Sequence, residues 1–407
     1  MFKGLSLDQA PPFEAPLLFL LTAPLWGIVG GVALLFAQSQ PQQIGVLHLF
    51  TIGFMAQVMI GALQQMLPVV VGVRFLKPTL LSKLIFAPLA LGIALFFIAF
   101  FGQNFSLLFF AASLLLLALW GFGAVTLWQL FQAPKATPTV WAMRLSLFSL
   151  LIAAGLGGHM AVGFAQGSLG GSFDILLLIH ALFAAFGWVG LLIVGVSYQV
   201  VPMFYVTPEP SEGFRNWLVW GTFALLLATA LGLFLSQKIA LALFVTLLFG
   251  YLLYGAWMLK LLQKRKRKIW EVSLYYWYVG LMSLFFLPLL WFFDPERFGT
   301  LFLFGFAISV MIGMLYKIIP FLSWFHISSR GFFDMPTMKE MIDQKMALVQ
   351  FGLHLLALIA LLLWPKAAAP FLVLSCALLL WLLSRPVRIY LEYKTKPGPF
   401  ETFSKGM

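Results

Sequence analysis

Long apolar segments separated by short polar connections run through this sequence, and no other feature limits the possible folds as much. A helix needs about 20 mostly apolar residues to cross the hydrocarbon core of a membrane, and about twelve segments meet this requirement. We therefore expect membrane-spanning helices over residues 15–38, 43–67, 79–102, 105–131, 139–165, 172–202, 214–236, 239–262, 270–293, 298–322, 342–364 and 369–392.

The composition excludes a soluble protein. Of the 407 residues, 62% are hydrophobic and only 9% are charged, whereas soluble domains carry about 25% charged residues. The net charge of +12 does not indicate nucleic-acid binding, because membrane proteins collect lysine and arginine on one side of the bilayer. We expect an all-α polytopic membrane protein that forms a single membrane domain over residues 1–407, with the lipid bilayer as its partner and no nucleic acid.

Basic residues are unevenly distributed between alternate connections, and this distribution predicts the orientation. The connections on one side hold only Lys238, Arg297 and Lys366, whereas those on the other side include the run KRKRK at 264–268. Because cytoplasmic connections carry the excess of lysine and arginine, we expect both termini in the cytoplasm. The basic residues assigned to the cytoplasmic side are Arg74, Lys77, Lys83, Lys135, Arg215, residues 264–268, Arg330, Lys339, Arg385, Arg388, Lys394, Lys396 and Lys405.

Three of the expected spans share one sequence pattern. They read HLFTIGFMAQVMIGALQQMLPVVVG, HALFAAFGWVGLLIVGVSYQVVPMF and LFLFGFAISVMIGMLYKIIPFLSWF. In each, a glycine precedes an aromatic residue, a second glycine follows eight residues later, and a proline follows seven residues after that. The matching positions are Gly53, Gly61 and Pro68; Gly187, Gly195 and Pro202; and Gly305, Gly313 and Pro320.

The pattern recurs every fourth span, which predicts three pseudo-threefold-related units of four helices over residues 15–131, 139–262 and 270–392. Glycines eight residues apart lie on one face of a helix and let a neighbouring helix approach closely, so we expect packing contacts there. Soon after the second glycine, each span carries a polar pair that we call its polar step. The polar steps are Gln64 and Gln65, Tyr198 and Gln199, and Tyr316 and Lys317.

Polar side chains within a span tend to face the interior of a bundle or a water-filled cavity. The polar steps therefore predict an inner cavity or a proton entry path near the cytoplasmic end of the bundle, where we expect each proline to end its helix. A second interpretation is open for Lys317, because a lysine near a helix end can extend its ammonium group to the membrane surface.

Four of the five histidines are expected in the outer half of the membrane. His48 and His180 lie near the start of two of the repeated spans, His159 lies near the end of the fifth span, and His354 lies within the eleventh. Imidazole is a common ligand of metals and of haem iron, so the group predicts haem or metal binding. A hydrogen bond between helices is the alternative for each single histidine. The fifth, His326, is expected at the cytoplasmic surface with an interfacial or structural role.

The number of spans, the pattern in every fourth span and the placement of the histidines together resemble the subunit I superfamily of haem-copper oxidases. The segments HLFTIGFMAQVMIGALQQMLP and HALFAAFGWVGLLIVGVSYQVVP look most like its C-type branch and the orphan relatives of that branch. The resemblance covers nearly the whole chain. It implies twelve spans in three four-helix arcs, both termini inside, and a place in the bacterial cytoplasmic (inner) membrane.

Two histidines match ligand positions of this superfamily. His48 matches the second-helix ligand of the low-spin haem, and His180 matches the sixth-helix copper ligand. The superfamily also carries two haem ligands on the tenth helix and two copper ligands on the seventh, but this sequence has no histidine at 298–312 or at 214–237. The resemblance therefore implies haem binding, while terminal oxidase activity is not expected.

Three functions remain open from the sequence. In the first, a b-type haem has His48 and His354 as axial ligands, and His159 and His180 form a second site for haem or copper. The protein would then serve electron transfer, the sensing of nitric oxide or oxygen, or respiratory-chain assembly; as an enzyme it would be a haem-dependent oxidoreductase. The second is a transporter or carrier of copper, haem or a small solute. The third is a haem-free structural subunit. The corresponding partners are respiratory or assembly membrane subunits, or further copies of the chain.

Overall fold

The computed structural model describes residues 11–397, and within this range every regular element is a helix. Twelve helices are long and apolar enough to cross a membrane, which confirms the expected number of spans and a polytopic membrane protein. Nine of these described spans consist of one long helix each, preceded in two cases by a short 3-10 turn. The long helices are α1 Glu14–Phe36, α4 Pro78–Phe101, α5 Leu108–Phe131, α6 Pro138–Gln166, α9 Glu212–Leu235, α10 Gln237–Gln263, α11 Val272–Phe293, α14 Gln344–Leu363 and α15 Ala369–Lys394.

The other three spans are those with the repeated pattern, and we call them the first, second and third core spans: Gln40–Val71, Phe173–Tyr205 and Pro295–Ser328. Each is divided into shorter segments. The first contains α2 Gln40–His48, η2 Leu49–Ala56, α3 Gln57–Met66 and η3 Leu67–Val71; the second contains α7 Phe173–Leu182, η5 Phe183–Gly190 and α8 Leu191–Tyr205; the third contains α12 Pro295–Thr300, η6 Leu301–Ile308 and α13 Ser309–Ser328.

A π-helical segment of eight residues occurs at the same place in every core span. These segments are η2, η5 and η6, and the first glycine of the pattern (Gly53, Gly187 or Gly305) is the fifth residue of each. Well under 1% of residues in globular proteins adopt π-helix, so three matching segments do not arise by chance. The repeated sequence therefore has a repeated local structure.

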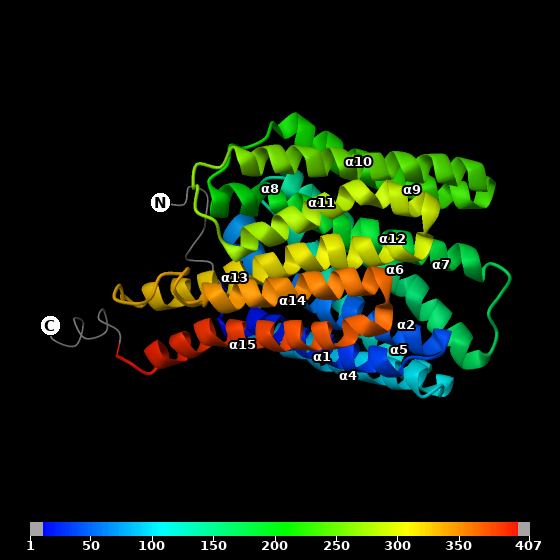
Figure 1. Cartoon of the computed structure of the whole chain (residues 1–407), viewed down its shortest axis with the longest axis horizontal. Helices are drawn as coiled ribbons and strands as arrows, with labels where there is room; N and C mark the ends of the chain where they lie inside the picture. The colour runs from blue at the N-terminus through cyan, green and yellow to red at the C-terminus, as the bar shows by residue number, and fades with distance from the viewer. Residues whose placement is uncertain (1–10, 398–407) are drawn as a thin grey trace.

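The core spans are the most buried part of the bundle. In their most apolar windows 72%, 61% and 83% of the residues are buried inside the protein, against 28–50% in the nine other spans. Figure 1 shows the helices running side by side along the long axis, with α10 near the upper edge of the view and α4 near the lower edge. The outer helices expose large apolar side chains, including Phe234, Phe249 and Leu363. Such a surface fits contact with lipid.

Both glycines of each core span pack against the span that precedes it. A Cβ on Gly53 or Gly61 would lie within 3.0 Å of Trp26 or Leu20 in α1. In the second core span the corresponding neighbours are Ser149 and Ala142 of α6, and in the third they are Ser283 and Tyr276 of α11. A side chain at these positions would push two helices apart.

The prolines of the pattern differ from our expectation that each ends its helix. Pro68 lies in η3, and this helix ends three residues later. Pro202 lies inside α8, and Pro320 lies inside α13, which continues for eight residues to Ser328. Proline removes one backbone donor without preventing further turns, provided that packing holds the helix together. The expectation is therefore wrong for Pro320.

The first and last long helices lie next to each other. α1 packs along α15, and Lys394 at the end of α15 binds Glu14 at the start of α1 with 2.9 Å between Nζ and Oε1. The described ends of the chain thus lie at the same end of the bundle (Figure 1). Lys405, which belongs to the expected basic tail, lies outside the described residues.

Candidate functional site

His48 and His180 lie side by side, although we had not paired them from the sequence. Their ring centroids are 6.4 Å apart with 23° between the ring planes. His48 is the last residue of α2, and His180 lies in α7 close to Gly157 of α6. A Cβ on Gly157 would lie 2.9 Å from Cε1 of the His180 ring, so a glycine there makes room for the imidazole.

Both imidazoles are held in the same tautomer by backbone carbonyl groups. Nδ1 of His48 is 2.8 Å from the carbonyl oxygen of Ile44, and Nδ1 of His180 is 2.8 Å from that of Ala153. A carbonyl oxygen can only accept, so each Nδ1 carries the proton and each Nε2 keeps its lone pair. Neither Nε2 has a hydrogen-bond partner among residues 11–397. This is the arrangement that metal-ligating histidines use, in which the distal N–H orients the ring.

The two rings are close enough for both imidazoles to contact one bound group. Their planes are stacked with 23° between them. The donor set is two neutral imidazoles, and imidazole is a common ligand of metal ions and of haem iron. The chemistry of these donors therefore suits a metal ion or haem iron.

The other two histidines of the expected group lie elsewhere. His159 is exposed on the surface of α6. His354 is buried in α14, where its Nε2 is 2.8 Å from the hydroxyl oxygen of Ser309 and its ring lies against Tyr276. The structure thus brings together neither His48 with His354 nor His159 with His180 as ligand pairs. Within residues 11–397, no three His, Cys, Asp or Glu side chains gather in a way that could hold a metal ion. His326, at the end of α13, binds the carbonyl group of Pro11, as an interfacial residue would.

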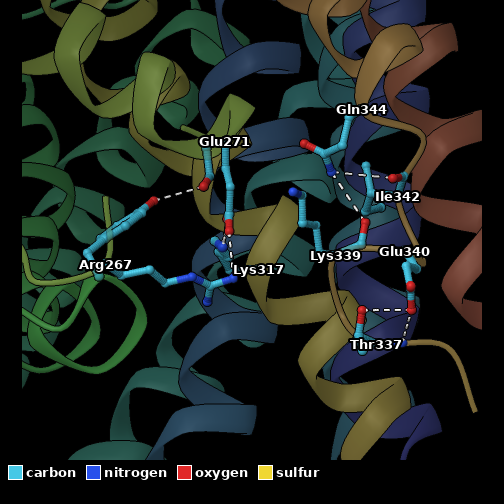
Figure 2. Close-up of polar contacts among 10 residues, drawn as sticks. Arg267, Glu271, Lys317, Thr337, Lys339, Glu340, Ile342 and Gln344 are labelled. Carbon is cyan, nitrogen blue, oxygen red and sulfur yellow. Dashed lines mark hydrogen bonds and ion pairs between the residues drawn. The ribbon is translucent and has the colours of Figure 1, made fainter. Parts of the chain in front are cut away.

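A second polar site surrounds Lys317 at the opposite end of the core spans. The ammonium group of Lys317 forms an ion pair with Glu271, and Arg267 binds the other carboxylate oxygen at 3.0 Å (Figure 2). The Lys317 and Glu271 side chains are 13% and 9% exposed. Lys317 therefore does not extend freely to the surface; it lines a cavity of about 250 Å³.

Tyr316, the other half of this polar step, belongs to a buried network. Its hydroxyl donates to the amide oxygen of Gln350 at 3.0 Å, and the Tyr276 hydroxyl donates to the same oxygen at 2.6 Å. The amide nitrogen of Gln350 donates to the Ser375 hydroxyl at 2.9 Å. The third polar step thus has partners in α11, α14 and α15.

The first two polar steps are buried with fewer partners. Gln64 accepts a hydrogen bond from Ser82 at 2.8 Å, but its amide nitrogen has no partner among the described residues. Both amide atoms of Gln65 and the hydroxyl of Tyr198 likewise have none there, while Gln199 is half-buried. Gln65 lines a cavity of about 20 Å³ whose other walls come from all three core spans. A cavity of this size has room for one water molecule.

Three residues of the second polar site were not predicted as site residues from the sequence: Glu271, Arg267 and Gln350. Glu271 stands just before α11. Its spacing of four from Arg267 is a signal for an ion pair, but its pairing with Lys317 bridges 46 residues of sequence. Gln350 is one of few polar residues inside its span, and this isolation is the signal that could have found it.

No known family matches the sequence, and no curated protein matches it significantly. The twelve-helix membrane architecture and the geometry of the two polar sites are therefore the basis for a function.

Proposed function

We propose that this is a multi-pass protein of the bacterial cytoplasmic membrane in which three four-helix units surround the core spans, with both termini in the cytoplasm. The matching π-helical segments and the glycine contacts of each core span with the preceding helix support three equivalent units. The orientation rests on the basic residues. The connections assigned to the outer side hold only three of them, Lys238, Arg297 and Lys366.

Within this architecture, we infer a divergent relative of haem-copper oxidase subunit I that binds a b-type haem. The observation that carries this inference is the pair His48 and His180, with their free Nε2 atoms and a centroid separation of 6.4 Å. A haem iron held there would supply one-electron redox chemistry. The carbonyl groups of Ile44 and Ala153 would fix the ring orientations and increase the basicity of both ligands.

Electron transfer is the use that this ligand set favours. If both histidines held the haem iron, a gas such as nitric oxide or oxygen would have to compete with them for it, so sensing is the less direct use. A part in respiratory-chain assembly is compatible with the same site. Oxygen reduction is not part of the proposal, because residues 298–312 and 214–237 contain no histidine to complete an oxidase centre.

Copper transport is the second candidate, and the same pair of histidines is the observation that favours it. Imidazole suits copper as well as iron, and two nitrogen ligands without a third would form a weak site from which an ion can leave. A carrier of haem or another solute and a haem-free structural subunit of a larger complex have no specific contact in their favour.

The test is the optical spectrum and metal content of the purified protein. We expect a sharp reduced α-band and about one iron per chain, with both lost in His48→Ala and in His180→Ala. His159→Ala is the matched control, since this exposed histidine lies in the same half of the bundle and its removal leaves the spectrum unchanged. Bound copper without iron would favour the carrier. A colourless protein that binds neither metal overturns both candidates.

A further inference from the structure

The cavity beside Lys317 is formed by segments far apart in the sequence. Its walls include Phe204 at the end of the second core span, Glu271 before α11, Tyr316 in α13 and Lys339 in the connection to α14. With about 250 Å³, it is slightly smaller than the pockets that bind drug-sized molecules, which measure about 300–1,000 Å³. It therefore suits a small group rather than a large ligand.

The side chains that line this cavity carry an excess of positive charge. Arg267, Lys317 and Lys339 contribute three positive charges, and Glu271 is the one acidic residue in the wall. The balance is therefore two positive charges. Arg267 and Lys317 share the Glu271 carboxylate, whereas Lys339 has no carboxylate partner among the described residues. Figure 2 shows Lys339 reaching toward the Glu271–Lys317 pair from the opposite side of the cavity.

The carboxylate of Glu340, the next residue along the chain, is engaged by Thr337 rather than by Lys339. Glu340 accepts hydrogen bonds from the backbone N–H and the hydroxyl of Thr337, both at 2.8 Å (Figure 2). These two donors lower the pKa of the Glu340 carboxyl, so it stays ionised while turned toward Thr337. Glu340 is not part of the cavity wall. The excess charge thus remains on the cavity itself.

Excess charge of one sign in a partly buried cavity is unfavourable unless an ion of opposite charge binds there. The hydrogen-bond donors that remain available also favour an anion. Lys317 and Arg267 each use only part of their N–H groups on Glu271. The ammonium group of Lys339 has no partner among the described residues. A phosphate group carries about −1.5 to −2 at pH 7, which balances the excess charge.

We propose that this cavity binds the phosphate group of a small phosphorylated molecule, through Arg267, Lys317 and Lys339. Arginine and lysine are the side chains that recognise phosphate, arginine by its planar fork and lysine as a point charge. Two sources share this chemistry. One is inorganic phosphate or a soluble phosphate monoester, and the other is the headgroup of an anionic lipid, since the cavity adjoins the basic run 264–268.

The experiment measures the thermal unfolding of the full-length protein in two arms. In the first, inorganic phosphate is added in detergent against sodium chloride of equal ionic strength; in the second, nanodiscs with phosphatidic acid are compared with neutral nanodiscs. We expect stabilisation in at least one arm. A response to phosphate identifies a soluble ligand, and a response to phosphatidic acid alone identifies a lipid.

Lys339→Gln is the informative variant, because this exposed side chain contributes charge to the cavity but has no partner whose loss would disturb folding. We expect it to weaken the binding about tenfold through the loss of one charge–charge contact. Lys345→Gln is the matched control, as Lys345 is also exposed, lies six residues further on and does not line the cavity. The proposal is overturned if neither arm stabilises the protein, if chloride acts as strongly as phosphate, or if the two variants respond equally.

Discussion

The polar steps of the first and third core spans occupy the same place in the repeated pattern but differ in how their polar atoms are satisfied. Lys317 and Tyr316 find partners in Glu271 and Gln350, while both amide atoms of Gln65 remain without one among residues 11–397. The third step borders a cavity of about 250 Å³, and the first borders a cavity of about 20 Å³ with room for a single water molecule. The charge of Lys317 is thus held in the bundle together with a counter-charge from a distant part of the chain.

The largest expected effect comes from removing the Glu271 carboxylate, which is the counter-charge of Lys317. Glu271→Gln leaves Lys317 largely buried without a negative partner, and we expect it to lower the free energy of unfolding by about 3 kcal/mol. The double variant Glu271→Gln, Lys317→Met should recover most of this loss, because it removes the unpaired charge as well. Unfolding in detergent, followed by helical circular dichroism against increasing denaturant, measures both.

An exposed ion pair gives the control for this prediction. Asp294 and Arg297 form a pair with side chains that are 30% and 48% exposed, and Asp294→Asn should cost less than about 1 kcal/mol. If Glu271→Gln is no more harmful than Asp294→Asn, the Lys317 ammonium group is solvated and the comparison between the two steps fails.

The glycine contacts are the feature that the core spans share, and a substitution there should have the next largest effect. A Cβ on Gly195 would overlap Ala142 of α6, whose short side chain cannot move aside. We expect Gly195→Ala to lower the free energy of unfolding by about 1–3 kcal/mol through overpacking. Gly250→Ala in α10 is the matched control, since nothing lies within 4 Å of its added Cβ, and the same assay should show no loss.

Much of the fold could be predicted from the sequence because its signals are local and periodic. Runs of apolar residues predicted the twelve spans. The spacing of Gly187, Gly195 and Pro202 distinguished the second core span from its neighbours. The contacts between spans could not be predicted in the same way. Lys317 lies in the third core span and Glu271 just before α11, and nothing in either local segment specifies the other.

The histidine pair shows the same limit. His48 and His180 differ by two positions relative to the pattern, which on equivalent α-helices turns them about 200° apart. That angle describes each helix separately, whereas the meeting of two side chains depends on which faces the helices present to each other. The structure places the ring centroids 6.4 Å apart, so the partner of each histidine could not be predicted from the sequence.

The smallest expected effect concerns Gln65, in the polar step of the first core span. Because both amide atoms of Gln65 are buried without a protein partner, Gln65→Leu removes a desolvated polar group and leaves no donor or acceptor behind. We expect the free energy of unfolding to stay within about 1 kcal/mol of the parent or to rise, since an apolar group of similar volume replaces an unsatisfied one. The same detergent unfolding assay measures the change. A loss of about 2 kcal/mol or more would instead mean that Gln65 holds a water molecule in the central cavity through real hydrogen bonds. In that case the first step is as well satisfied as the third, by solvent rather than by a second span.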